Sequence, residues 1–325
     1  MNSMSRNSQG ISVTSRKSQS GEGIVNAMTV DVEDYFHVSA FAKVIDPAQW
    51  ENYECRVENN TLRLLRLLEQ HETKATFFVL GWVARHYPGV VRRIVEAGHE
   101  IACHGLTHKL VYNQTPEEFR EETHTAKQLL EDIIQKPVIG YRAASYSITA
   151  KSLWALDILA DLGFLYDSSI FPIRHDRYGI RDAVRRPHVL RTAGGASLLE
   201  FPLSTRDFAF LRLPVSGGGY FRLFPYALTR SALASINRRE KMPFIFYLHP
   251  WEIDPDQPRI EASWLSRFRH YNNLQKCESM LDRLLGEFRF GTVHESLASC
   301  GLRTGEVAQQ GEQNVMLPQA HKASE

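Results

Sequence analysis

The sequence predicts an α/β fold in which helices cover a mostly parallel β-sheet. Short apolar segments alternate with helical patterns along most of the chain, and this alternation is typical of such a fold. The chain has 325 residues, of which 43% are hydrophobic, so it can fill a large core. Its formal charge of +1 gives no broad field directed at nucleic acid or an anionic membrane. We therefore expect a globular protein without a nucleic-acid partner.

The first half of the chain contains a βαβ pattern followed by a second helix and strand. "AMTV" (27–30) is a first strand, and leucines at helical spacing in "TLRLLRLLEQH" (61–71) predict an amphipathic helix. "ATFFVLG" (75–81) is the second strand. A helix over 88–98 begins with proline and ends with glycine, and "HEIACHG" (99–105) follows as the third strand.

The middle of the chain continues the alternation. Thr115 is a good N-cap and Pro116 a favourable first residue for a helix that continues to residue 134. "PVIGYRAA" (137–144) predicts the fourth strand and "SLWALDILADLGF" (152–164) the next helix.

The last part of the chain is less regular at first. Residues 174–242 predict turns and short strands and resemble an insertion or elaboration. "PFIFYLHPWEI" (243–253) is then a strongly apolar strand, and a last helix covers 273–288. We expect a disordered leader over 1–27, a single domain over 28–302 and a loose polar tail over 303–325.

Cysteine usage and the leader bear on localisation. The four cysteines are scattered, without metal-knuckle pairs or the density of a disulfide-stapled domain. The leader lacks the apolar stretch of a signal peptide, and no run approaches the roughly 20 apolar residues of a membrane span. These patterns predict a cytoplasmic protein without a transmembrane segment.

Ionisable side chains follow several of the predicted strands. Functional groups of parallel α/β sheets gather at the carboxyl ends of the strands, so these side chains predict one shared site. The residues at the strand ends are Asp31, Glu33, Asp34, His104, His108, Arg142, Tyr146 and His249.

The segment "HGLTH" suggests two metal ligands. If the chain turns helically after Cys103, the rings of His104 and His108 lie on one face and reach the same ion. A carboxylate is the natural third ligand, which leaves positions open for water and substrate. Gly105 stands where a zinc protease motif has its glutamate base. Taken alone, the two histidines are better explained as polar loop residues, but the acidic strand end upstream favours the metal site.

The acids of "TVDVEDYF" allow more than one interpretation. An aspartate after a strand is commonly a helix cap or a solvated strand end. Alternation along a strand puts Asp31 and Glu33 on one side and Asp34 on the other. The geometry therefore favours Asp31 and Glu33 as the working pair.

Four segments, "TVDVEDYF", "HGLTH", "GYRAASY" and "FYLHPWE", together resemble the motifs of the polysaccharide deacetylase family, which includes nodulation-type chitooligosaccharide deacetylases. The resemblance runs from about 28 to 300. "GGGYFRLFP", "YLHPWEIDPDQPRI" and "RHYNNL" resemble the subgroup found beside bacterial exopolysaccharide genes in PEP-CTERM loci. The resemblance implies a distorted (β/α) barrel in place of an open sheet, with 174–302 as the subgroup-specific part of a single catalytic domain.

The resemblance also implies roles for individual residues. Asp31 becomes the general base, oriented by Arg142, and His249 the general acid. His104 and His108 become ligands of a divalent metal such as Zn²⁺, together with Glu33 or Asp34, because Val32 separates the acids that are adjacent in the family motif.

Two aromatic residues of these motifs are candidates for contact with the substrate. Tyr146 is displaced in "RAASYS" but remains a candidate for substrate contact. Trp251 is a candidate sugar-stacking wall, with buried packing as the alternative.

The expected activity is metal-dependent N-deacetylation of an N-acetylated oligo- or polysaccharide. Hydrolysis of another non-peptide amide on the same site, or a silent carbohydrate-binding protein, are the alternatives. The sequence leaves open which sugar is the substrate, which metal is held, and whether the substrate is free or lipid-linked.

Overall fold

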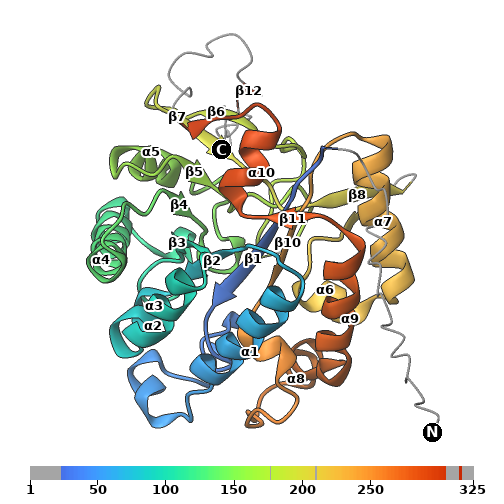
Figure 1. Cartoon of the computed structure of the whole chain (residues 1–325). Helices are drawn as coiled ribbons and strands as arrows, with labels where there is room; N and C mark the ends of the chain where they lie inside the picture. The colour runs from blue at the N-terminus through green and yellow to red at the C-terminus, as the bar shows by residue number, and fades with distance from the viewer. Residues whose placement is uncertain (1–22, 176, 209–210, 305–314, 317–325) are drawn as a thin grey trace, which may run out of the picture.

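The computed structural model describes residues 23–175, 177–208, 211–304 and 315–316 (Figure 1). Within these residues, one sheet has the strand order β10-β1-β2-β3-β4-β5-β7-β6-β12, and β11 also pairs with β1. Every pairing is parallel except the antiparallel hairpin of β6 and β7. Helices surround the curled sheet (Figure 1). This is the expected distorted (β/α) barrel.

The strands of the sheet are short apart from the first. Their bounds are β1 Asn26–Val32, β2 Thr76–Val79, β3 Glu100–Cys103, β4 Gly140–Tyr141, β5 Tyr166–Asp167, β6 His188–Arg191, β7 Ser197–Glu200, β10 Ile245–Leu248, β11 Phe290–Gly291 and β12 Val315–Met316. A separate hairpin consists of β8 Thr205–Phe208 and β9 Leu211–Pro214.

The α-helices of the described residues range from one to five turns. Their bounds are α1 Val57–Gln70, α2 Gly81–His86, α3 Pro88–Glu96, α4 Pro116–Ile134, α5 Trp154–Asp161, α6 Gly218–Leu223, α7 Tyr226–Arg239, α8 Trp264–Tyr271, α9 Leu274–Glu287 and α10 Val293–Ser299. None of these described helices has the length and apolarity needed to cross a bilayer.

Local signals explain where the predicted elements begin and end. The α4 helix opens with a capping box, in which Thr115 and Glu118 satisfy each other's backbone N–H groups, and with Pro116 in its first turn. The β1 strand is buried at all seven positions, as a parallel strand covered on both faces should be. It begins at Asn26, within the range expected for the leader. Residues 1–22 of that leader lie outside the described part.

The sheet separates two layers of apolar side chains. Alternation along β2 turns Phe77 toward the outer helices and Phe78 into the barrel. Val293 and Leu297 of α10 join the inner cluster, and the backbone N–H of Val293 donates to Thr76 Oγ1 at 2.8 Å. The helix α10 therefore closes the end of the barrel where the strands start. The opposite end, where the strands finish, stays open for a site.

The irregular segment 174–242 contains the expected short strands and two helices that the pattern did not predict. The longer one, α7, buries Thr229 and Asn237 alongside Ala232, Leu233 and Ile236. Polar residues at core positions blur the apolar stripe on which a helix prediction depends. Asn237 is satisfied there because its side chain exchanges hydrogen bonds with that of Asn26 at 2.8 and 3.1 Å.

Candidate active site

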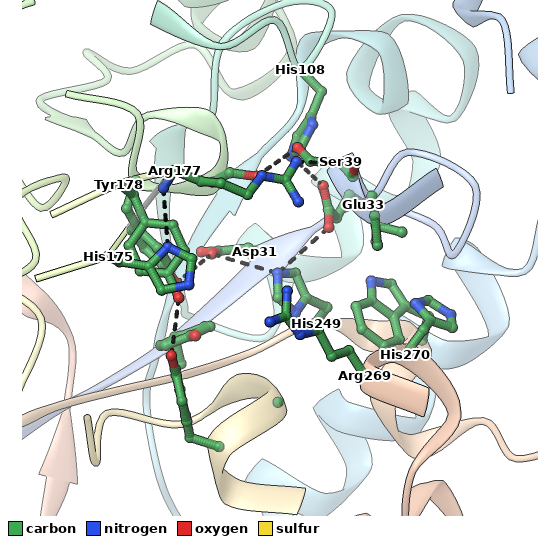
Figure 2. A pocket seen from close by; sticks show the side chains of 18 of the residues that line it. Asp31, Glu33, Ser39, His108, His175, Arg177, Tyr178, His249, Arg269 and His270 are labelled. Carbon is green, nitrogen blue, oxygen red and sulfur yellow. Dashed lines mark hydrogen bonds and ion pairs between the residues drawn. The ribbon is translucent and has the colours of Figure 1, made fainter. Parts of the chain in front are cut away.

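The predicted strand-end residues meet in one pocket of about 380 Å³ at the open end of the barrel (Figure 2). Asp31, Glu33, His104, His108 and His249 line this pocket. Arg142 lies behind Asp31 and is fully buried. Groups from β1, β3, β4 and β10 therefore converge, as the position of functional residues in parallel barrels leads us to expect.

Arg142 holds Asp31 in a fixed position. Its Nη1 lies 2.6 Å from Asp31 Oδ1 and also donates to Thr29 Oγ1 at 2.9 Å. Its Nε and Nη2 donate to the backbone carbonyl and hydroxyl of Ser168 at 3.2 and 3.1 Å, and its guanidinium carbon lies 4.0 Å from the ring centroid of Phe78. Burial opposes the charge, but the carboxylate of Asp31 outweighs it and raises the pKa of Arg142.

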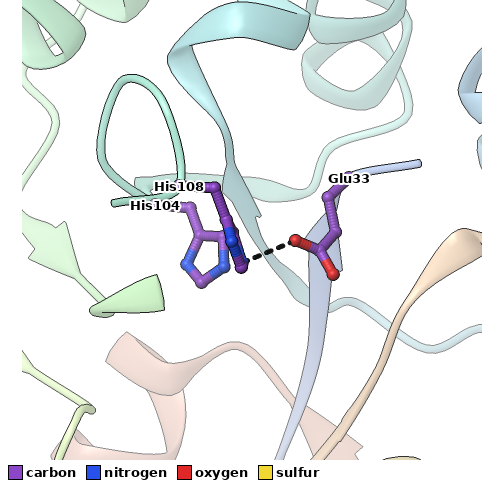
Figure 3. A group of neighbouring side chains, drawn as sticks. All are labelled: Glu33, His104 and His108. Atoms are coloured by element: carbon purple, nitrogen blue, oxygen red, sulfur yellow. Dashed lines mark ion pairs between the residues drawn. The ribbon is translucent and has the colours of Figure 1, made fainter. Parts of the chain in front are cut away.

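Glu33, His104 and His108 form a cluster of metal-ligand type (Figure 3). One ligand atom from each lies within 4.8 Å of the others. His108 Nε2 approaches Glu33 Oε2 to 2.8 Å, yet this buried oxygen makes no hydrogen bond among the described residues. A buried oxygen without a donor, facing two imidazoles, fits a cation held between them.

The protonation states in this cluster suit metal binding. Burial lowers the pKa of His104 to about 4, and its Nδ1 lies 2.9 Å from the backbone carbonyl of Arg142. Because a carbonyl only accepts, Nδ1 carries the proton and Nε2 keeps its lone pair. Burial raises the pKa of Glu33, but the neighbouring imidazoles, above all His108, outweigh burial and lower the pKa of Glu33.

The two histidines converge through a loop, so the expectation of a helical turn after Cys103 is wrong. Residues 104–110 contain no helix. Gly105 and His108 have φ values of 78° and 56°, and this left-handed backbone turns the chain so that the centroids of the two imidazoles lie 5.6 Å apart. Glycine adopts this conformation without a Cβ penalty.

Asp34 has a structural role, which removes it as the alternative metal ligand. Its Oδ1 accepts from the backbone N–H of Tyr35 at 2.9 Å. Its Oδ2 accepts from the backbone N–H groups of Arg56 and Val57 at 2.6 and 2.8 Å. The carboxylate thus accepts hydrogen bonds from the backbone N–H groups at the start of α1. Of the two acids left open by the motif, Glu33 is the one placed beside His104 and His108.

His249 stands at the end of β10, facing both acids. Its Nε2 lies 3.5 Å from Glu33 Oε1 and 3.9 Å from Asp31 Oδ2. Its Nδ1 lies 2.8 Å from Glu252 Oε1, and Arg222 Nε donates to the other oxygen of Glu252 at 2.6 Å. Burial opposes protonation, but Glu252, Glu33 and Asp31 outweigh it and raise the pKa of His249 to about 9.

Glu252 and Arg222 did not appear among the predicted site residues. Glu252 follows His249 by three residues in "HPWE" and closes a capping box with it on the short 3₁₀ helix Pro250–Ile253. That spacing is a local signal that could have identified Glu252. Arg222 stands 30 residues away from its partner, and no local pattern indicates such a pair.

Trp251 lines the pocket but is mostly buried, which favours packing, the alternative to a sugar-stacking wall. The side chain is 5% exposed, and its two neighbours are imidazoles in nearly parallel planes. The centroid of His249 lies 5.0 Å away at 17°, and that of His270 lies 4.1 Å away at 18°. With its ring stacked on these imidazoles, Trp251 offers little surface to a sugar.

Tyr146 lies beside Asp31 in spite of its displacement in the motif. Its Oη lies 3.4 Å from Asp31 Oδ2, and its ring lines the pocket. Ser145 and Tyr146 have φ values of 49° and 55°, which is uncommon for consecutive residues other than glycine. This turn brings Tyr146 into the site despite the changed spacing.

Comparison with known proteins gives the family. Residues 49–166, which include His104, His108 and Arg142, match the model of the family described as "Polysaccharide deacetylase". This part of the chain belongs to the polysaccharide deacetylase family. Residues 168–298 match a second model, described as a domain of unknown function, DUF3473. The irregular segment, α8 and α9 fall within that second match.

Curated relatives resemble only part of this chain. A chitooligosaccharide deacetylase of Bradyrhizobium is 34% identical over 97 residues, which is 30% of this chain and 42% of that protein. A peptidoglycan deacetylase of Helicobacter pylori is 25% identical over 146 residues, or 45% of each chain. The chain thus spans less than half the length of these relatives.

Solved structures share the fold of this chain at low identity. A Mycobacterium smegmatis structure assigned to the polysaccharide deacetylases has a TM-score of 0.57 at 19% identity, covering 91% of this chain and 96% of the other. The Puue allantoinase has a TM-score of 0.57 at 12% identity, covering 90% and 92%. The distorted barrel is therefore the fold of both comparison proteins.

Proposed function

We propose that this protein removes N-acetyl groups from amino sugars of an oligo- or polysaccharide in a metal-dependent hydrolysis. The observation that carries the proposal is the meeting, in one pocket, of three groups with different chemistry. These are the oriented carboxylate of Asp31, the ligand cluster of Glu33, His104 and His108, and the protonated His249. The names of the relatives, all deacetylases of N-acetylated glycans, support this substrate class.

Glu33, His104 and His108 would hold the divalent ion. One carboxylate and two imidazoles are a donor set that suits Zn²⁺. When bound, such an ion polarises a carbonyl group and lowers the pKa of a coordinated water.

Asp31 acts as general base. Arg142 occupies Oδ1, so Oδ2, which faces His249 and Tyr146, accepts the proton of the water that attacks the acetamide carbonyl. The contact with Arg142 fixes the orientation of the carboxylate for this task.

His249 acts as general acid. Nδ1 of His249 donates a hydrogen bond to Glu252, so Nε2 is the nitrogen that faces the pocket. Nε2 donates its proton to the departing amine as the C–N bond breaks. The products are acetate and a free amino sugar, and the proton taken by Asp31 balances the one given by His249.

The biological setting follows from the subgroup motifs. "GGGYFRLFP" and "YLHPWEIDPDQPRI" contribute Arg222, Glu252 and the wall of the pocket, and they resemble proteins of exopolysaccharide loci. An exopolysaccharide or its precursor is therefore the substrate we propose.

Acetate release tests the function directly. Zinc-loaded protein is incubated with chitooligosaccharides and with N-acetylated exopolysaccharide fragments, beside the variants His104→Ala and Asp31→Asn. The matched controls are His124→Ala and Asp132→Asn, which change exposed residues of α4. We expect release by wild type and controls and loss in both site variants. Equal release by all five proteins, or release only from small non-saccharide amides, would contradict the proposal.

A further inference from the structure

We infer that the saccharide carries a negative charge, a carboxylate or a phosphate, which Arg177 and Arg269 bind at the mouth of the pocket. This inference rests on the proposed function and specifies its substrate. The charged side chains that line the pocket are acidic at its floor and basic at its mouth.

The floor of the pocket holds both of its acids. Among the described residues, Asp31 and Glu33 are the acidic side chains that line it, and each has a partner in the chemistry. Asp31 pairs with Arg142, and Glu33 faces His104 and His108. Neither acid is available to neutralise a cation at the mouth.

The mouth holds cations that no described carboxylate neutralises. Arg177 and Arg269 both line the pocket and are exposed. Arg177 Nη2 donates to the backbone carbonyl of Ser39 at 3.3 Å, and no ion pair forms between either guanidinium and the acids of the described residues. Figure 2 shows Arg177 beside Ser39 at the top of the pocket and Arg269 below His249. A ligand between them meets positive charge from two sides.

The backbone of Arg269 is fixed by the same residue that supports the general acid. Arg222 Nη1 donates to the carbonyls of His270 and Asn272 at 2.7 Å each, and Nη2 to that of Arg269 at 3.3 Å. The Nε of the same guanidinium donates to Glu252, the partner of His249. The end of α8 is thereby held at a set position relative to the reacting groups.

Neutral sugars would not need these guanidinium groups. Aromatic faces and hydroxyl groups suffice for them, and the mouth supplies both in Tyr178, Tyr220 and Phe268. The hydroxyl groups of Tyr178 and Tyr220 lie 3.2 Å apart. A guanidinium adds a planar fork that matches the oxygens of a carboxylate or a phosphate. Uronic acids and sugar phosphates are the saccharides that carry these groups.

Binding and turnover on matched saccharides test the inference. The neutral probe is an N-acetylglucosamine disaccharide. The carboxylate probe is the same disaccharide with the primary alcohol of one sugar oxidised to a carboxylate. The phosphate probes are N-acetylglucosamine 1-phosphate and a nucleoside diphosphate N-acetylglucosamine. Calorimetry gives Kd and acetate release gives kcat/KM. We expect wild type to favour at least one anionic probe about tenfold over the neutral one. The carboxylate and phosphate arms show which anion is recognised.

The variants Arg177→Gln and Arg269→Gln should reduce that preference to less than about threefold. The controls Arg174→Gln and Arg267→Gln change exposed arginines of the same two segments that do not line the pocket, and they should retain the preference. Equal binding of neutral and anionic probes, or a preference that survives Arg177→Gln and Arg269→Gln together, overturns the inference. If acetate is released from the neutral probe and from none of the anionic probes, the inference on a charged saccharide fails while the proposed function stands. Anion-selective binding without acetate release would support the inference and contradict the proposed function.

Discussion

Glu252 Oε1 accepts a hydrogen bond from Nδ1 of His249 at 2.8 Å. The other carboxylate oxygen of Glu252 accepts a hydrogen bond from Arg222 Nε at 2.6 Å. Both the carboxylate and the guanidinium are nearly inaccessible to solvent. A buried carboxylate between two cationic partners fixes the tautomer of the imidazole and favours its charged form. This pair therefore links the packing of α6 and α8 to the chemistry of the pocket.

Replacing Glu252 by Gln should impair the general acid. The amide oxygen can still accept from Nδ1, but the negative charge that supports the imidazolium is lost. We expect kcat to fall about 10²-fold, with little change in KM, in steady-state assays of acetate release. A matched Glu69→Gln change at an exposed position of α1 should leave kcat unaffected. An equal fall in both variants would show that the effect is not specific to the site.

The carboxylate of Glu252 should make the free energy of unfolding depend on pH. Burial raises the pKa of Glu252, but the charges of Arg222 and His249 and their hydrogen bonds outweigh it and lower the pKa from 4.5 to about 2. A lowered pKa stabilises the fold fully above pH 4.5, and this contribution is lost as the pH falls from 4.5 to 2. The shift corresponds to about 3 kcal/mol.

Urea unfolding of wild type and Glu252→Gln across this range measures that contribution. We expect the difference between their free energies of unfolding to be largest above pH 4.5 and to shrink by about 3 kcal/mol toward pH 2. A difference that stays constant with pH would mean that folding does not lower the pKa of Glu252.

Local patterns predicted much of the fold and part of the site. The capping signal at Thr115, the proline at residue 88 and the glycine at residue 98 correctly predicted the ends of α3 and the start of α4. Alternation along β1 correctly separated Glu33 from Asp34. These signals succeed because each depends on contacts between residues close in the sequence.

Contacts between distant segments could not be predicted in the same way. Arg222 meets Glu252 only after α6 has packed against the end of β10, and Trp251 loses its exposure because His270 of α8 covers it. The loop from His104 to His108 brings both rings together through left-handed backbone, and the spacing of the two residues does not distinguish that loop from a helical turn. Tertiary packing determines each of these features.

Glu33 and Asp34 should differ in their effect on metal binding. Glu33→Gln removes a ligand charge between His104 and His108 and should weaken Zn²⁺ binding about 10²-fold. Asp34→Asn changes hydrogen bonds to the first turn of α1 and should keep the metal while destabilising the fold by about 1–2 kcal/mol. Competition with a chromogenic chelator gives the affinity, and urea unfolding gives the stability. Loss of zinc from Asp34→Asn with retention in Glu33→Gln would reverse the assignment.

Arg142 should act through Asp31, and lysine should not replace it. The guanidinium contacts Asp31, Thr29 and Ser168 at once, and the single ammonium of lysine cannot reproduce that fork. We expect Arg142→Lys to lower kcat about 10²-fold or more while zinc affinity stays close to that of wild type. Arg142→Ala should recover part of its activity in the presence of guanidinium ion, and Asp31→Asn should not. The exposed change Arg120→Lys, at a pair with Asp161, controls for the substitution itself. Because a general loss of folding would lower zinc affinity and would not respond to guanidinium, rescue of the alanine variant identifies a positioning role for Arg142.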